Sequence, residues 1–258
     1  YAIYVTQVTV TGGSNITTTA GNAKSSSAFT ASGGHGVLTL SLSGNNSGNG
    51  ISIDTNTGIV STSVNTGANT YYDTVTATDD LGNKASETIT IIVNQPVSLT
   101  AASSPTITQG KSGSFSSVVT ITNGTGPFTY SITNTSGGVS IDSSTGTISL
   151  VSSGSNLTAG THYETVTVTD SQGISGTVVI TIVVNGSISF TSVSNIFTSV
   201  GRADTTTAPS ISGGTGTKTF ALVSPDSGVT INSSTGVVSV NGSLAQGSYN
   251  ETMTVTDQ

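Results

Sequence analysis

Residues 141–149 read "IDSSTGTIS", and the same phrase recurs as "IDTNTGIVS" at 53–61 and "INSSTGVVS" at 231–239. The glycine of the phrase is spaced by 88 and then 90 residues from one copy to the next. Self-similarity at a fixed interval is the signature of a repeat architecture. The chain therefore consists of a unit of about 90 residues, written nearly three times.

Each copy of the phrase predicts a tight turn between two short apolar stretches. Asp142 can accept a backbone N–H within the turn, and Gly146 can take a positive φ without a Cβ clash. This is typical of a short hairpin loop with glycine at the left-handed position. We expect 54–58 and 232–236 to form the same turn.

A second phrase follows each turn, as "YYDTVTATD" (71–79), "HYETVTVTD" (162–170) and "YNETMTVTD" (249–257). Apolar and hydroxyl side chains alternate along it, so one face is expected in the core and the other in water. A sandwich domain often places a tyrosine near the start of this strand, with its hydroxyl tied to the preceding loop. The tyrosines predicted for this role are Tyr72, Tyr163 and Tyr249.

The composition supports β-structure and excludes several functions. Hydrophobic residues make up 33% of the 258 and charged residues only 7%, with a net charge of −7. Val, Ile and Leu alternate with Thr and Ser, a pattern that fits half-buried strands and not helices. Without cysteine there is no disulfide and no thiolate ligand. The five basic residues form no stripe for nucleic acid, and no apolar run is long enough for membrane insertion.

At these residues the sequence resembles the immunoglobulin-like and cadherin-like repeats of bacterial and archaeal surface proteins, of the adhesin or stalk type. The second copy carries their pattern as "GTGPFTYSI", "GVSIDSSTGTIS" and "AGTHYETVTVTDSQG". The resemblance implies an all-β fold of tandem immunoglobulin-like/cadherin-like β-sandwich domains of about 90 residues each. The expected domains are 1–94, 95–185 and 186–258.

Cadherin repeats bind calcium between domains, so the resemblance requires a check of the ligand motifs. The aspartates that match, or lie beside, the acidic position after the second phrase are Asp79, Asp80, Asp170 and Asp257. The other acidic motifs of cadherins are absent, and calcium prefers six to eight oxygen ligands with several carboxylates. These four are therefore weak candidates, no cofactor is expected, and the favoured interpretation is that the aspartates cap the loop after the strand.

Nine Asn-x-Ser/Thr sequons permit N-linked glycans if the secretion route supplies them. They lie at Asn15, Asn45, Asn123, Asn134, Asn156, Asn185, Asn232, Asn241 and Asn250. No sequence motif of a catalytic site is present, and neither His35 nor His162 has a recurring partner. The chain is not expected to be an enzyme.

These features favour a structural segment of an extracellular fibre, stalk or surface-layer array that gives reach and attachment and self-associates. The alternative is an adhesin module that binds a carbohydrate or receptor, with a polysaccharide or cell-surface partner. Short linkers such as 94–96, in which Pro96 restricts two residues, predict an extended and semi-rigid array.

The two ends of the chain raise one more expectation. The third copy stops at Gln258, just after "TMTVTD", and lacks the last strand that closes the other two. Residues 1–6 line up, with one residue skipped, with the end of such a closing strand. Either the chain is a window of a longer periodic protein, which we favour, or 1–6 of one subunit fill the gap in the third domain of its neighbour.

Overall fold

The computed structural model describes residues 6–44, 49–116, 118–152 and 157–258, and all regular structure in these ranges is β-strand. In the same ranges no helix is long and apolar enough to cross a membrane. The all-β prediction is therefore confirmed for the described chain, and it follows from the alternating β-branched residues noted above.

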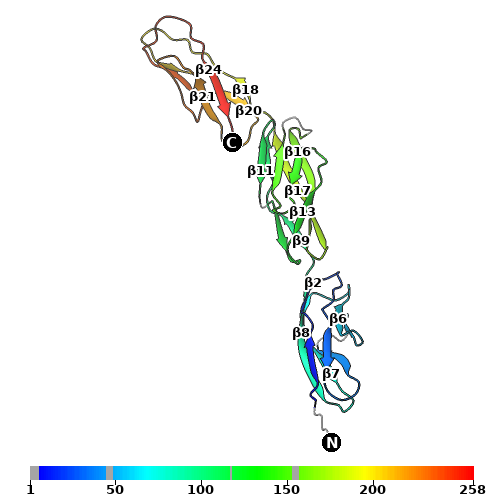
Figure 1. The fold of residues 1–258 in the computed structure, drawn as a ribbon. Coiled ribbons are helices and arrows are strands. Elements are labelled where there is room, and N and C mark those ends of the chain that lie inside the picture. The colour runs from blue at the N-terminus through cyan, green and yellow to red at the C-terminus, as the bar shows by residue number, and fades with distance from the viewer. Residues whose placement is uncertain (1–5, 45–48, 117, 153–156) are drawn as a thin grey trace. The chain divides into compact units, whose positions relative to one another are not determined.

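The described part of the first repeat holds eight strands, labelled in Figure 1 where there is room. They are β1 (Thr9–Gly12), β2 (Ile16–Thr19), β3 (Phe29–Ser32), β4 (Thr39–Gly44), β5 (Ile51–Asp54), β6 (Ile59–Thr62), β7 (Asn69–Thr78) and β8 (Lys84–Asn94). The main sheet has the order β2-β8-β7-β4, and β1-β3 and β5-β6 form smaller sheets. Strand β8 is antiparallel to β7 and parallel to β2, so it lies in the interior of the sheet.

The second repeat repeats this arrangement. Its strands are β9 (Ser98–Ala101), β10 (Thr106–Thr108), β11 (Ser112–Phe115), β12 (Val119–Thr122), β13 (Thr129–Ile132), β14 (Val139–Ile141), β15 (Ile148–Val151), β16 (Gly160–Thr169) and β17 (Ser175–Asn185). The main sheet is β10-β17-β16-β13, and the others are β11-β15-β14 and β12-β9. Strand β17 thus takes the place of β8, with the same parallel pairing to its neighbour β10.

The third repeat has a smaller main sheet. Its strands are β18 (Ser189–Ser192), β19 (Asp204–Thr205), β20 (Ser210–Ser212), β21 (Thr219–Val223), β22 (Val229–Ile231), β23 (Val238–Val240) and β24 (Thr252–Thr256). They form the sheets β18-β20, β19-β23-β22 and β21-β24. In Figure 1, β24 (red) lies against β21, and no strand of the described third repeat takes the place of β8 or β17.

The chain forms two compact units whose boundaries run through the second repeat. One comprises 1–100, 119–131 and 167–178, and the other 101–118, 132–166 and 179–258. The end of the first repeat and the start of the second thus lie in one unit. The end of the second repeat and the start of the third lie in the other. The division into domains at 1–94, 95–185 and 186–258 stays a prediction.

Alternation along the long strands builds the core. In β7, Val75 and Ala77 are completely buried while the intervening threonines are half-buried. The same holds for Val166 and Val168 in β16. The equivalent Met253 of β24 is only half-buried, because the third repeat has fewer strands to cover it.

The hairpin turn of the opening phrase has the predicted geometry in all three copies. The φ angles of Gly58, Gly146 and Gly236 are 71°, 70° and 71°. The Asp142 carboxylate accepts the N–H of Ser144 at 2.9 Å and that of Thr145 at 2.7 Å. Side-chain oxygens of the equivalent Asp54 and Asn232 accept the same two N–H groups in their own turns.

Candidate functional site

Asp170 lies at the end of β16, where the sequence predicts a residue that caps the following loop. One oxygen, Oδ1, accepts the backbone N–H of Gln172 and of Ile174, both at 2.9 Å. Asp79 does the same for Leu81 and Asn83 in the first repeat. The predicted capping role is confirmed for these two aspartates.

The other oxygen of Asp170 belongs to a contact between the first and second repeats, inside one compact unit. Its Oδ2 accepts the hydroxyl of Thr19 at 2.5 Å and the backbone N–H of Thr125 at 3.0 Å. The hydroxyls of Thr19 and Thr125 are 2.7 Å apart, and Asn94 Nδ2 donates to Thr125 Oγ1 at 2.8 Å. These four residues form a closed polar cluster, here named the first junction.

The same four-residue cluster recurs between the second and third repeats, inside the other compact unit. Asp257 Oδ2 accepts the hydroxyl of Thr108 and, at 2.8 Å, the N–H of Thr215. Thr108 Oγ1 and Asn185 Nδ2 are both hydrogen-bonded to Thr215 Oγ1, at 2.9 and 3.0 Å. We name this cluster the second junction.

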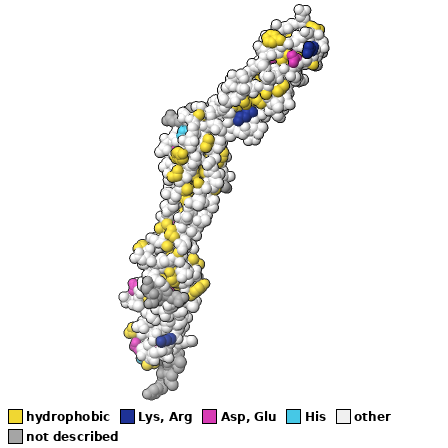
Figure 2. Space-filling model, turned by 180° about the vertical axis from the view of Figure 1, so that it is seen from behind, with side chains coloured by type: hydrophobic (Ala, Val, Ile, Leu, Met, Phe, Trp, Pro, Cys, Tyr) yellow, Lys and Arg dark blue, Asp and Glu magenta, His cyan; other side chains and the backbone are white. Residues whose placement is uncertain are grey.

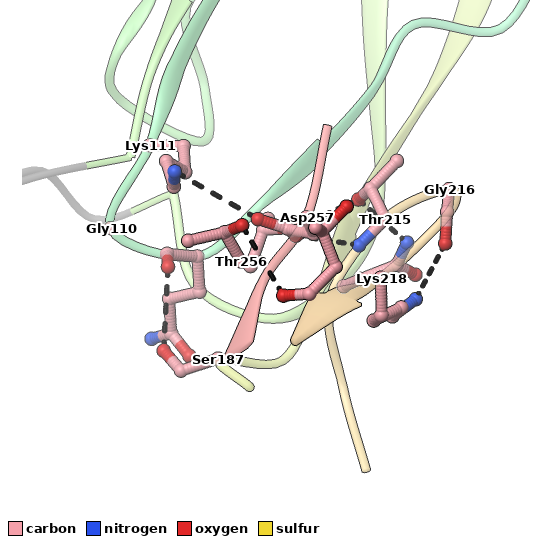
Figure 3. A network of polar contacts seen from close by, with 12 residues as sticks. Gly110, Lys111, Ser187, Thr215, Gly216, Lys218, Thr256 and Asp257 are labelled. Atoms are coloured by element: carbon pink, nitrogen blue, oxygen red, sulfur yellow. Dashed lines mark hydrogen bonds and ion pairs between the residues drawn. The ribbon is translucent and has the colours of Figure 1, made fainter. Parts of the chain in front are cut away.

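Figure 3 shows Asp257 between Lys111 of the second repeat and Thr215 of the third. Lys111 adds a charge to this junction, with its Nζ 3.8 Å from Asp257 Oδ1. The Lys111 side chain is 57% exposed, so the ion pair is screened by water and contributes little by itself. The hydroxyl and N–H donors, not the lysine, define the site.

The donors hold both junction carboxylates in their anionic form. Burial raises the pKa of Asp170, but hydrogen bonds from Thr19, Ile174, Thr125 and Gln172 outweigh it, and the pKa is lowered overall. The hydroxyl of Thr108 is the largest influence that lowers the pKa of Asp257. Chemically, each junction is a carboxylate held by hydroxyl and N–H donors, an arrangement that fixes geometry.

The four calcium candidates are distributed over three places. Asp79 and Asp80 lie in one loop of the first repeat, where Asp79 Oδ2 accepts the N–H of His35 at 3.0 Å and Asp80 Oδ2 that of Val37 at 3.1 Å. Asp170 and Asp257 lie one in each junction. Among the described residues, no three His, Cys, Asp or Glu side chains are grouped as metal ligands. A calcium ion at these positions would have to compete with protein donors for the carboxylates.

His35 takes the place that Thr125 and Thr215 take in the two junctions. The phrase "GGHG" at 33–36 aligns with "GGTG" at 213–216, and the backbone N–H bonds the aspartate in both. The side chain of Asn83 is the largest influence that lowers the pKa of Asp79. The first repeat therefore carries the acceptor half of a junction.

The tyrosine anchor lies one residue from its predicted position in two of the repeats. Tyr71 donates its hydroxyl to the carbonyl of Gly67 at 2.8 Å, whereas Tyr72 is 67% exposed. In the second repeat, His162 Nε2 lies 2.7 Å from the carbonyl of Thr158, and Tyr163 is 63% exposed. The prediction is wrong for Tyr72 and Tyr163, because alternation along the strand turns them away from the core.

The third repeat keeps the predicted anchor. Tyr249 donates its hydroxyl to the carbonyl of Ala245 at 3.1 Å. In every repeat the ring thus reaches a carbonyl four residues earlier. The alignment of the second phrase places Tyr71, His162 and Tyr249 in one column, which is the signal that identifies them.

A buried glutamate was not predicted from the sequence. Glu164 of β16 is 1% exposed, and its carboxylate accepts the hydroxyl of Thr133 at 2.6 Å and the N–H groups of Thr135 and Ser136 at 3.2 and 3.0 Å. Burial raises its pKa, but these donors outweigh that effect and the pKa is lowered. Glu164 therefore holds the loop after β13 in place.

The sequons differ in accessibility. Asn45 and Asn156 lie outside the described residues. The exposed sequon asparagines are Asn15, Asn123, Asn134, Asn232, Asn241 and Asn250. Asn185 is half-buried and donates to Thr215 in the second junction, so a glycan on its Nδ2 would compete with that contact.

No protein-family model matches the sequence, and no curated protein matches it. Among solved structures, immunoglobulin domains 1–5 of Sidekick-1 align over 97% of this chain and 56% of theirs, with a TM-score of 0.55 and 12% identity. An I-band fragment from titin aligns over 92% and 88%, with a TM-score of 0.47 and 12% identity. The human Desmocollin-1 ectodomain aligns over 98% and 59%, with a TM-score of 0.43 and 15% identity.

Identities of 12–15% are evidence for the fold alone. The chain is an all-β protein of tandem immunoglobulin-like β-sandwich domains, one of the two related folds that the sequence resemblance implied. It spans about half the length of the Sidekick-1 fragment.

Proposed function

We propose that this chain is a structural segment of an extracellular fibre, stalk or surface-layer array of a bacterial or archaeal surface protein. Its role is to hold attachment points at a distance, without catalysis. The observation that carries the proposal is the polar junction, built twice from equivalent residues and each time inside one compact unit.

The junction is suited to hold one repeat in a fixed orientation to the next. The Asp170 carboxylate accepts four donors and the Asp257 carboxylate two, beside its ion pair with Lys111. Either carboxylate is costly to disrupt, because any donor removed leaves a buried charge less well satisfied. The direct linkers are short, and Pro96 stiffens the first of them. Consecutive repeats joined in this way resist bending better than repeats joined by a flexible linker.

The surface is consistent with a spacer that does not bind partners through charged side chains. Figure 2 shows one face, on which the Lys, Arg, Asp and Glu side chains are few and scattered among uncharged side chains. Ordinary soluble domains carry about 25% charged residues, against 7% here. Hydroxyl and amide groups supply the solubility, as suits an exposed array with sequons on its surface.

Small-angle scattering tests the proposal. The chain is expected to be extended and semi-rigid, and a variant with Thr19→Val and Thr108→Val is expected to show a broader distribution of interatomic distances. Thr17→Val, at an exposed position of the same strand β2, is the matched control. A compact globule, or identical scattering with and without the two junction threonines, contradicts the proposal. The same curves with a chelator present should be unchanged.

A second candidate function is supported by the exposed tyrosines. Tyr72 and Tyr163 occupy equivalent positions on β7 and β16 and are 67% and 63% exposed. An exposed tyrosine offers an apolar ring face and a polar hydroxyl, the two kinds of contact that a sugar ring can take up. A glycan array compared between the chain and a Tyr72→Ala, Tyr163→Ala variant tests this candidate, and the absence of any hit on the unchanged chain rules against it.

A further inference from the structure

The asparagine of the second junction is followed by glycine. Asn185 is the last residue of β17, and Gly186 begins the segment that leads to β18. In such a pair the backbone nitrogen of the glycine can attack the side-chain amide of the asparagine, because glycine has no Cβ to hinder the approach. Asparagine followed by glycine is therefore the dipeptide most prone to spontaneous deamidation. The first junction has the same asparagine, Asn94, but Gln95 follows it.

The surroundings of Gly186 differ from those of two other Asn-Gly pairs. Such pairs occur at 49–50, 123–124, 185–186 and 241–242. The N–H of Gly124 donates to the carbonyl of Gln95 at 2.8 Å, which holds the nitrogen that would attack. Asn241 Oδ1 accepts the N–H of Ser243 at 3.0 Å, which holds that side chain within its own turn. A Cβ at Gly186 would meet nothing within 4 Å, so packing does not hinder a rearrangement there.

The restraint on the Asn185 side chain comes from the next repeat. Its Nδ2 donates to Thr215 Oγ1 at 3.0 Å, while its backbone carbonyl accepts the N–H of Gln109 at 2.8 Å. The side-chain amide must leave Thr215 before its carbon can meet the nitrogen of Gly186. Because Thr215 belongs to the third repeat, the restraint lasts only while the junction is closed. Local openings of such contacts occur in folded proteins.

We propose that Asn185 is a deamidation site controlled by the second junction. When the junction opens, the nitrogen of Gly186 bonds to Cγ of Asn185, and the bond from Cγ to Nδ2 breaks. The proton of the Gly186 N–H leaves with Nδ2 as ammonia, and a cyclic imide remains. Water then opens the imide at one of its two carbonyls, which gives aspartate or isoaspartate. In isoaspartate the main chain runs through Cγ, so the linker gains one methylene group.

The product does not restore the original junction. A carboxylate has no hydrogen to donate, so residue 185 no longer donates to Thr215 Oγ1. Asp257 Oδ2 already accepts the N–H of Thr215 at 2.8 Å. Two negative charges then lie beside one threonine, and each disfavours the charged form of the other. An opening that lasts long enough for the reaction is thereby made permanent.

This inference rests on the proposed function, since loosening matters only where the junction holds two repeats in place. In the first junction, Asn94 Nδ2 donates to Thr125 Oγ1 at 2.8 Å. The side chain of Gln95 crowds the nitrogen that would attack Asn94, so this junction keeps its asparagine. The chain therefore has one durable junction and one whose opening leaves a chemical record.

Peptide mapping by mass spectrometry, on folded chain kept in mildly alkaline buffer, tests the site. Asn185 is expected to convert to aspartate and isoaspartate with time, while Asn94 does not. Thr215→Val removes the acceptor of the Asn185 amide and should speed the conversion roughly two- to tenfold, the factor by which one neutral hydrogen bond shifts an opening equilibrium. Thr217→Val, at an exposed position of the same loop, is the matched control. Gly186→Gln gives this junction the dipeptide of the first and should slow the conversion to the rate of Asn94.

Chain unfolded in denaturant supplies the unrestrained rate, at which Asn185 and Asn241 should react alike. Thr108→Val opens the same junction from the second repeat and serves as a second accelerating variant, and thermal melts establish that each variant is folded. If Asn185 stays intact in both variants long after the unfolded chain has reacted, the site is overturned. Equal rates in the Thr215→Val and Thr217→Val chains overturn control by the junction.

Scattering tests the consequence for the junction. Asn185→Asp should broaden the distribution of interatomic distances, and a curve identical to that of the original chain contradicts the loosening. The spacer function is tested separately by the Thr19→Val, Thr108→Val chain, which needs no deamidation. The two proposals can therefore fail independently of each other.

Discussion

The hydroxyl of Thr19 lies 2.5 Å from a carboxylate oxygen of Asp170, a residue 151 positions further along the chain. Both residues are buried, with Thr19 0% and Asp170 5% exposed. Thr108 and Asp257 repeat the relationship at the next junction. The hydrogen bond therefore couples consecutive repeats through a neutral donor and a buried anion.

Removing the hydroxyl should weaken this coupling measurably. Thr19→Val keeps the shape of the side chain but leaves Asp170 without one donor, and a hydrogen bond to a charged group is worth roughly 1.5–3 kcal/mol. We expect a loss of about that size in the free energy of unfolding, measured with denaturant. Thr17→Val, on the exposed face of the same strand, should change it little. Equal effects of the two substitutions would contradict the assignment.

At acidic pH, the stability of the folded chain should depend on the protonation of the two junction aspartates. The pKa values of Asp170 and Asp257 are lowered in the folded chain. The unfolded chain therefore binds more protons as the pH falls, so their contribution is complete above the unfolded pKa of about 4 and is lost below it. Melting temperatures measured from pH 6 to pH 2 should fall below about pH 4. Asp170→Asn should flatten that fall, and a chain that grows more stable toward pH 2 would contradict the prediction.

Glu164 offers a comparison between repeats. Glu164→Ala removes the acceptor of the loop after β13 and should cost roughly 2–3 kcal/mol of unfolding free energy. Glu251 is the equivalent residue of the third repeat, and its Oε1 accepts the N–H of Asp226 at 3.0 Å. Glu251→Ala should cost less, because Glu251 is only half-buried. Denaturant titrations of the two variants decide the order, and a larger loss from Glu251→Ala would be inconsistent with the structure.

The hairpin glycines should not tolerate a β-branched side chain. Valine at Gly58, Gly146 or Gly236 is expected to cost roughly 1–3 kcal/mol, because each φ lies near +70°. The loss should be large at Gly58, where a Cβ would lie 2.0 Å from the carbonyl oxygen of Phe29. Gly186→Val is the matched control, since a Cβ there meets nothing within 4 Å. Neutral thermal melts for all three turn variants would refute the turn assignment.

The features predicted correctly from the sequence are those that depend on neighbours in the chain. The turn at 54–58 needs only an acceptor and a glycine at fixed offsets, and the core face of β7 needs only alternation. The junctions depend on Thr19 meeting a residue 151 positions away. Within a single repeat, nothing in the sequence distinguishes that threonine from its many neighbours. Comparison of the repeats could have pointed to it, because Ser/Thr-x-Gly recurs at 19–21, 108–110 and 199–201.

The tyrosine anchor shows how a one-residue error in register changes the chemistry of a side chain. Tyr71 is 5% exposed with its hydroxyl on the Gly67 carbonyl, whereas Tyr72 points to solvent. Tyr71→Phe should cost roughly 1 kcal/mol, since it removes one hydrogen bond and leaves the ring in the core. Tyr72→Phe is the matched control and should leave the unfolding free energy within about 0.5 kcal/mol of the original. Chemical denaturation of both variants checks the assignment, and a loss confined to Tyr72→Phe would restore the anchor to the position that the sequence first suggested.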